Sequence, residues 1–332
     1  MADDVYKHLE TARTKLGEFM GCDGDDLFFV PNPTTGVTTI INSLEINPGD
    51  EILSTDHEYG ALEKTWEFIA RKTHSKFVKT TVPIPLLSAE QFTESVWSGV
   101  TKRTRILFLS HITSATSLLF PISELIKRAK ERGILTIIDG AHVPGHISLD
   151  IQKLDADIYT GACHKWMCTP KGVSFLYVRK ELQEDVHPLV VSWGWESERP
   201  GPSKFLDWHE WQGTRDMSAF LTVPTAVKFL EDHNWRDVSR KCRELVVTFR
   251  KKFIDHLNIE SPCPDNWLGQ MASIPLPVLD AVTFKKNLME TYHIQVPVFE
   301  WGNKTYLRYS IQAYNSEDEL TKLLSAVKEL LS

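Results

Sequence analysis

The segments ILTIIDGAHVPG (134–145) and DIYTGACHKWMCTPKGVSF (157–175) alternate apolar runs with polar turns. ILTIID, ADIYTGA and GVSFLYVRK each indicate a buried strand, because short apolar runs bounded by turn residues are typical of strands in a parallel sheet. Asp139 ends the first of these strands, and Lys165 ends the second beside His164. This stretch therefore predicts neighbouring strands of one sheet with charged side chains at their ends.

The rest of the first two-thirds of the chain also alternates strand and helix signals. Strands are indicated by four apolar segments: DLFFVP, EILST, KFVKTTVPI and RILFLSHI. Apolar residues at helical spacing predict helices over 4–20, 60–71 and 121–133. This order favours an α/β domain with a mainly parallel sheet. From Trp235 a long charged helix leads into short strands and helices, which predict a smaller α+β domain.

The composition excludes several classes of protein. The chain has 332 residues, a formal charge of -7, five cysteines and no apolar run long enough to span a bilayer. The negative charge argues against a nucleic-acid binder. An odd number of cysteines without a C-x-x-C pair argues against a disulfide scaffold or a zinc site. We therefore expect a cytoplasmic protein with no metal, membrane or nucleic-acid partner.

Polar residues follow several of the predicted strands, where open α/β sheets bind ligands. Thr34 and Thr35 open a helix after DLFFVP, and exposed amides at such a helix start suit a phosphate, although a plain helix cap is the commoner interpretation. His57 follows EILST, and Ser114 lies in the polar loop after RILFLS. Each residue alone is compatible with a structural role.

Asp139, His142 and Lys165 make the set more specific. A carboxylate at the end of a buried strand is costly unless a cation or donors compensate it, so Asp139 either caps a helix, binds a metal or serves a site. Lys165 alone would be interpreted as a surface lysine. Together these residues predict pyridoxal 5′-phosphate as the cofactor. This cofactor requires an Asp for its pyridine nitrogen, a lysine for a Schiff base, and hydroxyls and amides for its phosphate.

IIDGAHVPG followed by YTGACHKWMCTPKG resembles the signature of the class V aminotransferase family of fold-type I pyridoxal-phosphate enzymes. Five further segments between about residues 12 and 325 also fall where that family has motifs: PNPTTGV, TDHEYGA, SHITSAT, WQGTRD and LRYSIQAYN. The chain most resembles the isopenicillin N epimerase-like branch, which includes C–S lyases of the ergothioneine pathway (hercynylcysteine sulfoxide lyases). The resemblance implies a large cofactor domain (12–234), whose mainly parallel seven-stranded sheet is sandwiched by helices, and a small α+β domain (235–332).

The resemblance also implies roles for individual residues. Lys165 would bind the cofactor covalently and move the Cα proton of an amino-acid substrate, while Asp139 would pair with the pyridine nitrogen. The other implied roles are His142 at the phenolic oxygen, His57 stacked on the ring, Thr34, Thr35 and His164 at the phosphate, Ser114 at the ring or substrate, Thr214 at the phosphate of the other subunit of a homodimer, Arg308 at the substrate carboxylate, and Tyr59 in acid–base work.

Two departures from the family pattern leave a non-catalytic relative as an alternative. Ala162 stands where the epimerase-like branch usually has Asn, so we expect one cofactor contact to be missing. Family members normally carry a further N-terminal segment, and this chain begins at the helix that follows it. We therefore expect that segment to be lost, replaced or covered by the partner subunit. Retention of Lys165, Asp139, His57 and Arg308 favours an enzyme.

The positions of the cysteines narrow the expected reaction. Desulfurases use a cysteine shortly before the carboxylate-binding arginine, but the nearest cysteine before Arg308 is Cys263. Persulfide-forming desulfuration is therefore not expected. We prefer a lyase that breaks the C–S bond of a cysteine-type substrate. Epimerisation, with Lys165 and Tyr59 on two faces of the substrate, is the alternative, and transamination is a third possibility.

Overall fold

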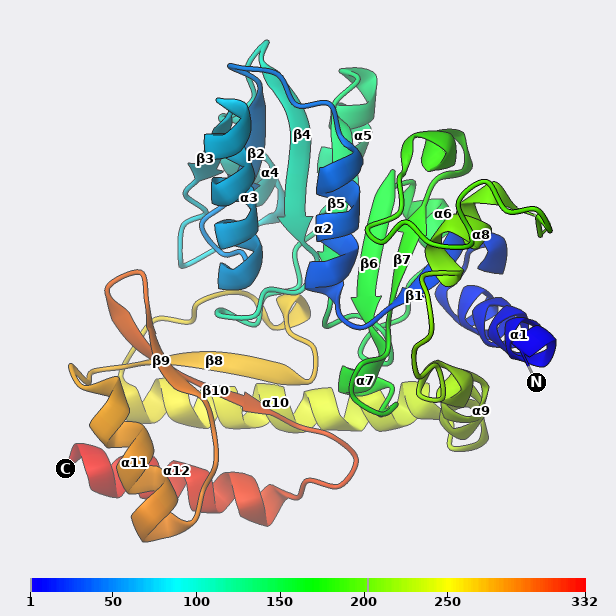
Figure 1. The fold of residues 1–332 in the computed structure, drawn as a ribbon. Helices are drawn as coiled ribbons and strands as arrows, with labels where there is room; N and C mark the ends of the chain where they lie inside the picture. The colour runs from blue at the N-terminus through cyan, green and yellow to red at the C-terminus, as the bar shows by residue number, and fades with distance from the viewer. Residues whose placement is uncertain (1, 202) are drawn as a thin grey trace.

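A seven-stranded sheet forms the centre of the computed structural model, which describes residues 2–201 and 203–332 (Figure 1). The strands are β1 (Leu27–Val30), β2 (Glu51–Thr55), β3 (Lys76–Thr80), β4 (Thr104–Ser110), β5 (Leu135–Gly140), β6 (Ile158–Ala162) and β7 (Ser174–Val178). Their order is β1-β7-β6-β5-β4-β2-β3. All neighbouring strands pair in parallel except β7, which is antiparallel to both β6 and β1. This confirms the predicted mainly parallel sheet.

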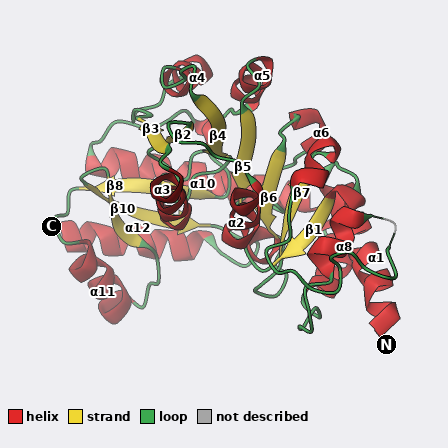
Figure 2. Cartoon of the chain, turned by 45° about the horizontal axis from the view of Figure 1, so that its top comes forward, coloured by secondary structure: helices red, strands yellow, loops and turns green. Residues whose placement is uncertain are grey.

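Helices cover both faces of this sheet. They are α1 (Ala2–Met20), α2 (Pro33–Ser43), α3 (Gly60–Thr73), α4 (Ala89–Trp97), α5 (Ser123–Glu131), α6 (Ile151–Leu154), α7 (Cys163–Trp166), α8 (Lys204–Glu210) and α9 (Val223–Asp232). Figure 2 shows α2 and α3 on one side of the sheet and α4 and α5 on the other. Phe108 belongs to the apolar cluster that contains residues of α2, α3 and α8, whereas its neighbour Leu107 belongs to the cluster that contains residues of α1, α4, α5 and α9, because successive residues of a strand point to opposite faces.

A second, three-stranded antiparallel sheet lies beyond the carboxyl ends of the parallel strands (Figure 1). Its strands are β8 (Met271–Leu276), β9 (Val298–Trp301) and β10 (Lys304–Ser310), in the order β8-β10-β9, and its helices are α10 (Trp235–Leu257), α11 (Ala281–Tyr292) and α12 (Glu317–Leu331). Four short 3-10 helices complete the described elements: η1 (Gly24–Asp26), η2 (Lys180–Asp185), η3 (Phe220–Thr222) and η4 (Asp265–Trp267). The division into 12–234 and 235–332 stays a prediction.

The hairpin β9–β10 contacts the large sheet directly. Gly302 and Asn303 both have positive φ, as the two central residues of a type I′ turn require. Just before this turn, Trp301 Nε1 donates to the carbonyl oxygen of Asp56 at 3.1 Å, and its ring packs on His57. The tight hairpin is therefore attached to the loop that follows β2.

We predict that Gly140→Ala destabilises the fold. Gly140 ends β5, and a Cβ at this position would overlap the phenol ring of Tyr159, which is fully buried and bonded to His111. Overpacking of this kind typically costs about 1–3 kcal/mol of unfolding free energy, measurable by urea denaturation.

Gly60→Ala is the control for that measurement. Gly60 starts α3 with ordinary φ, and a Cβ added there would have no heavy atom within 4 Å. Its expected change in unfolding free energy is within about 0.5 kcal/mol. Equal stability of the two variants would contradict the tight approach of Gly140 to Tyr159.

Candidate active site

A cavity of about 500 Å³ lies at the carboxyl ends of β1, β2, β4, β5 and β6. Its lining combines the ends of strands that are far apart in sequence, as the parallel topology requires. Eight predicted site residues line it: Thr34, Thr35, Tyr59, Ser114, Asp139, His142, His164 and Lys165. His57, Thr214 and Arg308 are outside this lining.

Asp139 and Lys165 lie at the ends of the neighbouring strands β5 and β6. Lys165 belongs to α7, directly after β6, and its Nζ lies 3.2 Å from Nε2 of His142. The Lys165 side chain is open to the cavity, yet the surrounding walls remove much of its hydration, and this desolvation lowers its pKa. The negative charge of Asp139 raises the pKa of Lys165, whereas the positive charge of Arg308 lowers it further. Burial raises the pKa of Asp139, against the influence of Lys165 and the Ala141 N–H. A lysine with a lowered pKa suits a nucleophile or base.

His142 is held by neighbours on both sides. Trp166 Nε1 donates to His142 Nδ1 at 3.3 Å, and His146 Nδ1 lies 2.9 Å from the His142 carbonyl oxygen. The backbone N–H of Gln270, from the segment before β8, donates to His146 Nε2. Burial holds the pKa of His142 well below its usual value, and the cations Lys165 and Arg308 add to this effect.

The start of α2, where the sequence predicts a phosphate, lines the cavity. Asn32 caps the helix, since its Oδ1 accepts from the Thr35 N–H at 2.9 Å and from Thr35 Oγ1 at 3.1 Å. His164 Nδ1 bonds the carbonyl oxygen of Val173 at 2.8 Å, so Nδ1 is the protonated nitrogen and Nε2 carries a lone pair. Asn32 was not predicted from the sequence, although Asn before Pro-Thr-Thr at a strand end is a cap signal.

His57 does not reach the cavity, in contrast to its predicted stacking role. Its side chain is 0% exposed, with Nδ1 bonded to Thr116 Oγ1 at 2.8 Å and Nε2 to the Val82 carbonyl oxygen at 2.9 Å. Tyr59 lines the cavity from the same loop and is 49% exposed. The motif TDHEYG offers two rings, and the residue spacing alone does not decide which one faces the cofactor.

Arg308 enters from β10 of the second sheet and touches the cavity lining through Ser114. Its Nη1 donates to the Ser114 carbonyl oxygen at 2.6 Å and to Ser114 Oγ at 3.0 Å. Its Nε is buried without a hydrogen-bond partner among the described residues. Since an unpaired buried donor is costly, this N–H is suited to an anionic group supplied by a ligand.

Two other positions singled out from the sequence do not line the cavity. Thr214 is exposed in the loop after α8, and Ala162 is fully buried at the end of β6. The described residues contain no cluster of three or more His, Cys, Asp or Glu side chains that could hold a metal. Within 2–201 and 203–332, no helix is long and apolar enough to cross a membrane.

Glu58 is a buried acid beneath the cavity that was not predicted from the sequence. Its Oε2 accepts from the Ser110 N–H at 2.8 Å and from Ser110 Oγ at 2.6 Å, and its Oε1 accepts from Thr55 Oγ1 at 2.7 Å. Ser110 itself lines the cavity and is the register partner of Asp139. Burial raises the pKa of Glu58 to about 8, and the nearby Asp139 contributes to the rise.

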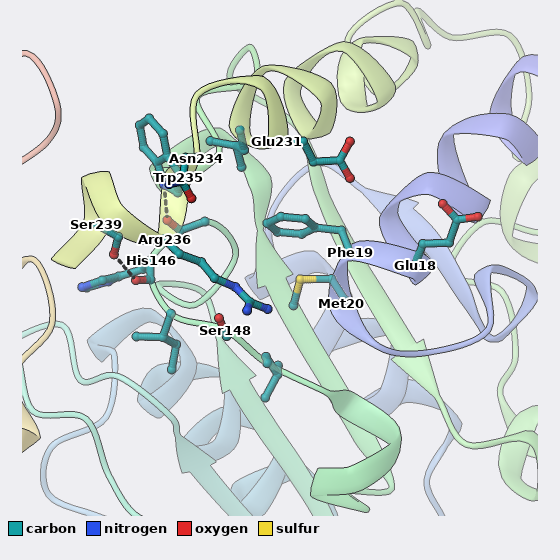
Figure 3. A pocket seen from close by; sticks show the side chains of 14 residues that line it. Glu18, Phe19, Met20, His146, Ser148, Glu231, Asn234, Trp235, Arg236 and Ser239 are labelled. Carbon is teal, nitrogen blue, oxygen red and sulfur yellow. Dashed lines mark hydrogen bonds between the residues drawn. The ribbon is translucent and has the colours of Figure 1, made fainter.

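A second cavity, of about 550 Å³, lies behind the loop that follows β5 (Figure 3). His146 lines it, together with residues of α1 and of the α9–α10 connection, and none of the predicted site residues does. Trp235 Nε1 donates to the Gly145 carbonyl oxygen at 2.8 Å, and Ser239 Oγ donates to the His146 carbonyl oxygen at 2.9 Å. One loop thus presents His142 to the first cavity and His146 to the second.

The family model for class V aminotransferases matches residues 1–323. The chain belongs to the class V aminotransferase family. It is 34% identical to an isopenicillin N epimerase of Amycolatopsis lactamdurans (97% of this chain, 85% of that protein). It is 25% identical to a probable chloroplastic L-cysteine desulfhydrase of Arabidopsis thaliana (99% and 75%). A solved complex of the cystine C–S lyase C-DES with cysteine persulfide has the same fold, with a TM-score of 0.83 and 19% identity (99% and 88%).

These similarities confirm the predicted fold type and the resemblance to the epimerase-like branch. Membership of the class V aminotransferase family identifies pyridoxal 5′-phosphate as the cofactor. The cavity fits this group: a buried carboxyl, a lysine with a lowered pKa and a helix start stand at three parts of its wall. The protein is accordingly a pyridoxal-phosphate enzyme of class V.

Glu58 generates a prediction about pH. In the unfolded chain its pKa returns to about 4.5, whereas burial raises it to about 8 in the folded protein. The folded state therefore binds the proton more tightly, and this residue makes stability fall as pH rises from about 4.5 to about 8. Glu58→Gln, which mimics the protonated acid, should leave stability unchanged at low pH and increase it at pH 8–9, as measured by urea denaturation across pH.

Glu63→Gln is the matched control, because Glu63 is a less buried acid on α3 paired with Lys79. It should not flatten the curve of stability against pH. A Glu58→Gln profile parallel to that of the wild type would contradict the raised pKa.

Proposed function

We propose that this enzyme breaks the C–S bond of a cysteine-type substrate by elimination at Cα and Cβ. The observation that carries the proposal is a cavity lined by Asp139, His142 and Lys165 whose lining contains no cysteine that could accept sulfur. Cys263 is buried, with its Sγ bonded to Arg250 at 3.1 Å, and no cysteine follows it in the sequence. Sulfur therefore leaves as a free thiol or sulfide and not as an enzyme persulfide.

The cofactor contacts follow from the cavity lining. We assign Asp139 to the pyridine nitrogen, Lys165 to the covalent bond, and His142 to the phenolic oxygen. When bound, pyridoxal 5′-phosphate supplies an electron sink for negative charge at the substrate Cα. We assign the phosphate to Thr34, Thr35 and His164, because two hydroxyls and an imidazole nitrogen line the cavity at the start of α2.

Arg308 and Ser114 are proposed to position the substrate. The unpaired Nε of Arg308 would donate to the α-carboxylate, and the bond from Nη1 to Ser114 fixes the plane of the guanidinium. His57 is proposed as a support for the hairpin and not as a ring-stacking residue, since both of its nitrogens are bonded away from the cavity. Tyr59 takes the stacking or acid–base position.

The proposed elimination removes a proton from Cα and the sulfur group from Cβ. The amine of Lys165 takes the Cα proton, the electron pair left on Cα forms the second bond of a Cα=Cβ double bond, and the C–S bond breaks with its electrons on sulfur. Tyr59 is proposed to protonate the departing sulfur, since it is the half-exposed acid of the lining. Hydrolysis of the remaining unsaturated amino acid gives pyruvate and ammonia. An S-substituted cysteine has the required bond and releases a thiol, whereas a hercynylcysteine sulfoxide has the same bond and would release its sulfur as a sulfenic acid.

Epimerisation is the second candidate, favoured by the 34% identity to an isopenicillin N epimerase. In that reaction Lys165 removes the Cα proton from one face and Tyr59 returns a proton on the other, so no bond to sulfur breaks. Transamination ranks third. The two leading reactions share the residues of the site and differ in the fate of the Cα electron pair.

We further propose a cytoplasmic homodimer with shared active sites. Thr214 is exposed, and Trp193 in the preceding loop segment is 82% exposed. Exposed aromatic residues are typical of subunit contacts. In such a dimer, Thr214 would reach the phosphate of the partner subunit. The free cysteines fit a reducing compartment.

The reaction is tested with S-substituted cysteines as substrates. We expect pyruvate and thiol in equal amounts, because elimination releases both from one molecule. The measurement follows pyruvate with lactate dehydrogenase and thiol with a chromogenic reagent, in deuterated buffer. Deuterium incorporation at Cα with loss of optical rotation and without pyruvate would overturn the lyase and support the epimerase.

Lys165→Ala tests the covalent attachment. The wild type should be yellow with added cofactor and carry a borohydride-stable adduct on Lys165, whereas the variant should lose the adduct and activity by at least about 10³-fold. Lys171→Ala, six positions further on and exposed, is the control and should keep both. A wild type that takes up no cofactor would instead indicate a non-catalytic relative.

A further inference from the structure

The hydrogen bonds around His142 permit only one arrangement of protons. The indole N–H of Trp166 is a donor and has no lone pair to accept with, so His142 Nδ1 must present a lone pair at 3.3 Å. A neutral imidazole with a lone pair on Nδ1 carries its proton on Nε2. That N–H faces Nζ of Lys165 at 3.2 Å.

The second step concerns the lysine. An ammonium group has three donors and no lone pair, so it cannot accept a hydrogen bond from His142 Nε2–H. Lys165 accepts this bond only as the neutral amine. If Trp166 did not donate to Nδ1, the imidazole proton could move there, and Nε2 could accept from a charged lysine. The indole N–H therefore decides which form of Lys165 the site stabilises.

We infer that Trp166 is a positioning residue that fixes the tautomer of His142 and so holds Lys165 as a neutral amine ready to bond the cofactor. The inference rests on the proposed role of Lys165 as the cofactor lysine. It also explains how one nitrogen serves twice: once Lys165 is engaged by the cofactor, the same Nε2–H is a donor for the phenolic oxygen that we assign to His142.

The charges around these groups agree with the inference. Lys165 faces Asp139 from β5, Arg308 from β10 and His142 from the loop after β5, and His142 faces Lys165, Arg308 and His146. Only Asp139 favours the ammonium, while desolvation and Arg308 oppose it. His146 adds no proton to this contact, because its Nε2 accepts from Gln270 N–H and its Nδ1–H donates to the His142 carbonyl oxygen.

The experiment compares Trp166→Phe with Trp235→Phe in the cofactor-free protein. Both variants keep an aromatic ring and lose an indole N–H, but the N–H of Trp235 bonds the Gly145 carbonyl oxygen and not His142. The readout is the rate of pyridoxal 5′-phosphate uptake against pH, followed by absorbance, because only the neutral amine attacks the aldehyde. We expect Trp166→Phe to slow uptake at pH 7 about tenfold and to shift the profile upward by about one unit. Trp235→Phe should match the wild type.

Nitrogen-15 NMR of histidine-labelled, cofactor-free wild type gives a second readout that no folding defect affects. The His142 signals, assigned by their loss in His142→Gln, should show an unprotonated Nδ1 and a protonated Nε2. A cationic ring or the opposite tautomer would overturn the inference, as would identical uptake profiles for wild type and Trp166→Phe or equal shifts in both Trp variants. A wild type that takes up no cofactor would defeat the role of Lys165 itself, while the NMR result would still decide the tautomer.

Discussion

The site depends on one constraint: a lysine, Lys165, and an acid, Asp139, are desolvated together at the ends of two neighbouring parallel strands. Lys165 and Asp139 lose hydration where β6 and β5 end, which lowers the pKa of Lys165 and raises the pKa of Asp139. Each residue opposes this shift in the other, because opposite charges attract. Burial favours the neutral form of each group, so a charge on either one is costly unless a partner or a ligand compensates it. A ligand that carries both an anionic and a cationic part offsets this cost, which is why the pair suits a phosphorylated pyridine.

The second sheet completes the site by contacts at the same edge. Arg308 bonds Ser114, Trp301 bonds Asp56, and the N–H of Gln270 bonds His146. Each contact joins a residue after position 235 to a loop that follows a strand of the large sheet. Arg308 and the loop that carries His142 are thus fixed by one packing arrangement, and a shift of the small sheet would change both together.

The parts of the fold and site that depend on periodicity could be predicted from the sequence. Apolar runs placed Asp139 and Lys165 at strand ends, and the parallel topology then brought Thr34, Ser114 and His164 to the same edge. Periodicity did not predict that His57 turns away and Tyr59 faces the cavity, because the loop after β2 is irregular and alternation stops there. Glu58 was also missed, since partners such as Ser110 come from another strand.

The same contacts explain why the family can direct one activated substrate to different products. In the proposed mechanism Lys165, Asp139 and Arg308 act on Cα, the cofactor and the carboxylate, and none of the three is assigned a contact with Cβ. The outcome depends on the group opposite the lysine and on whether the cavity holds an acid where sulfur departs. We propose Tyr59 for either role, because it is half-exposed and sits at the start of α3, where its hydroxyl is not committed to a buried partner among the described residues. We therefore propose that the choice between lyase and epimerase lies in the substrate that fills the space beside Tyr59 and not in the residues assigned to the cofactor.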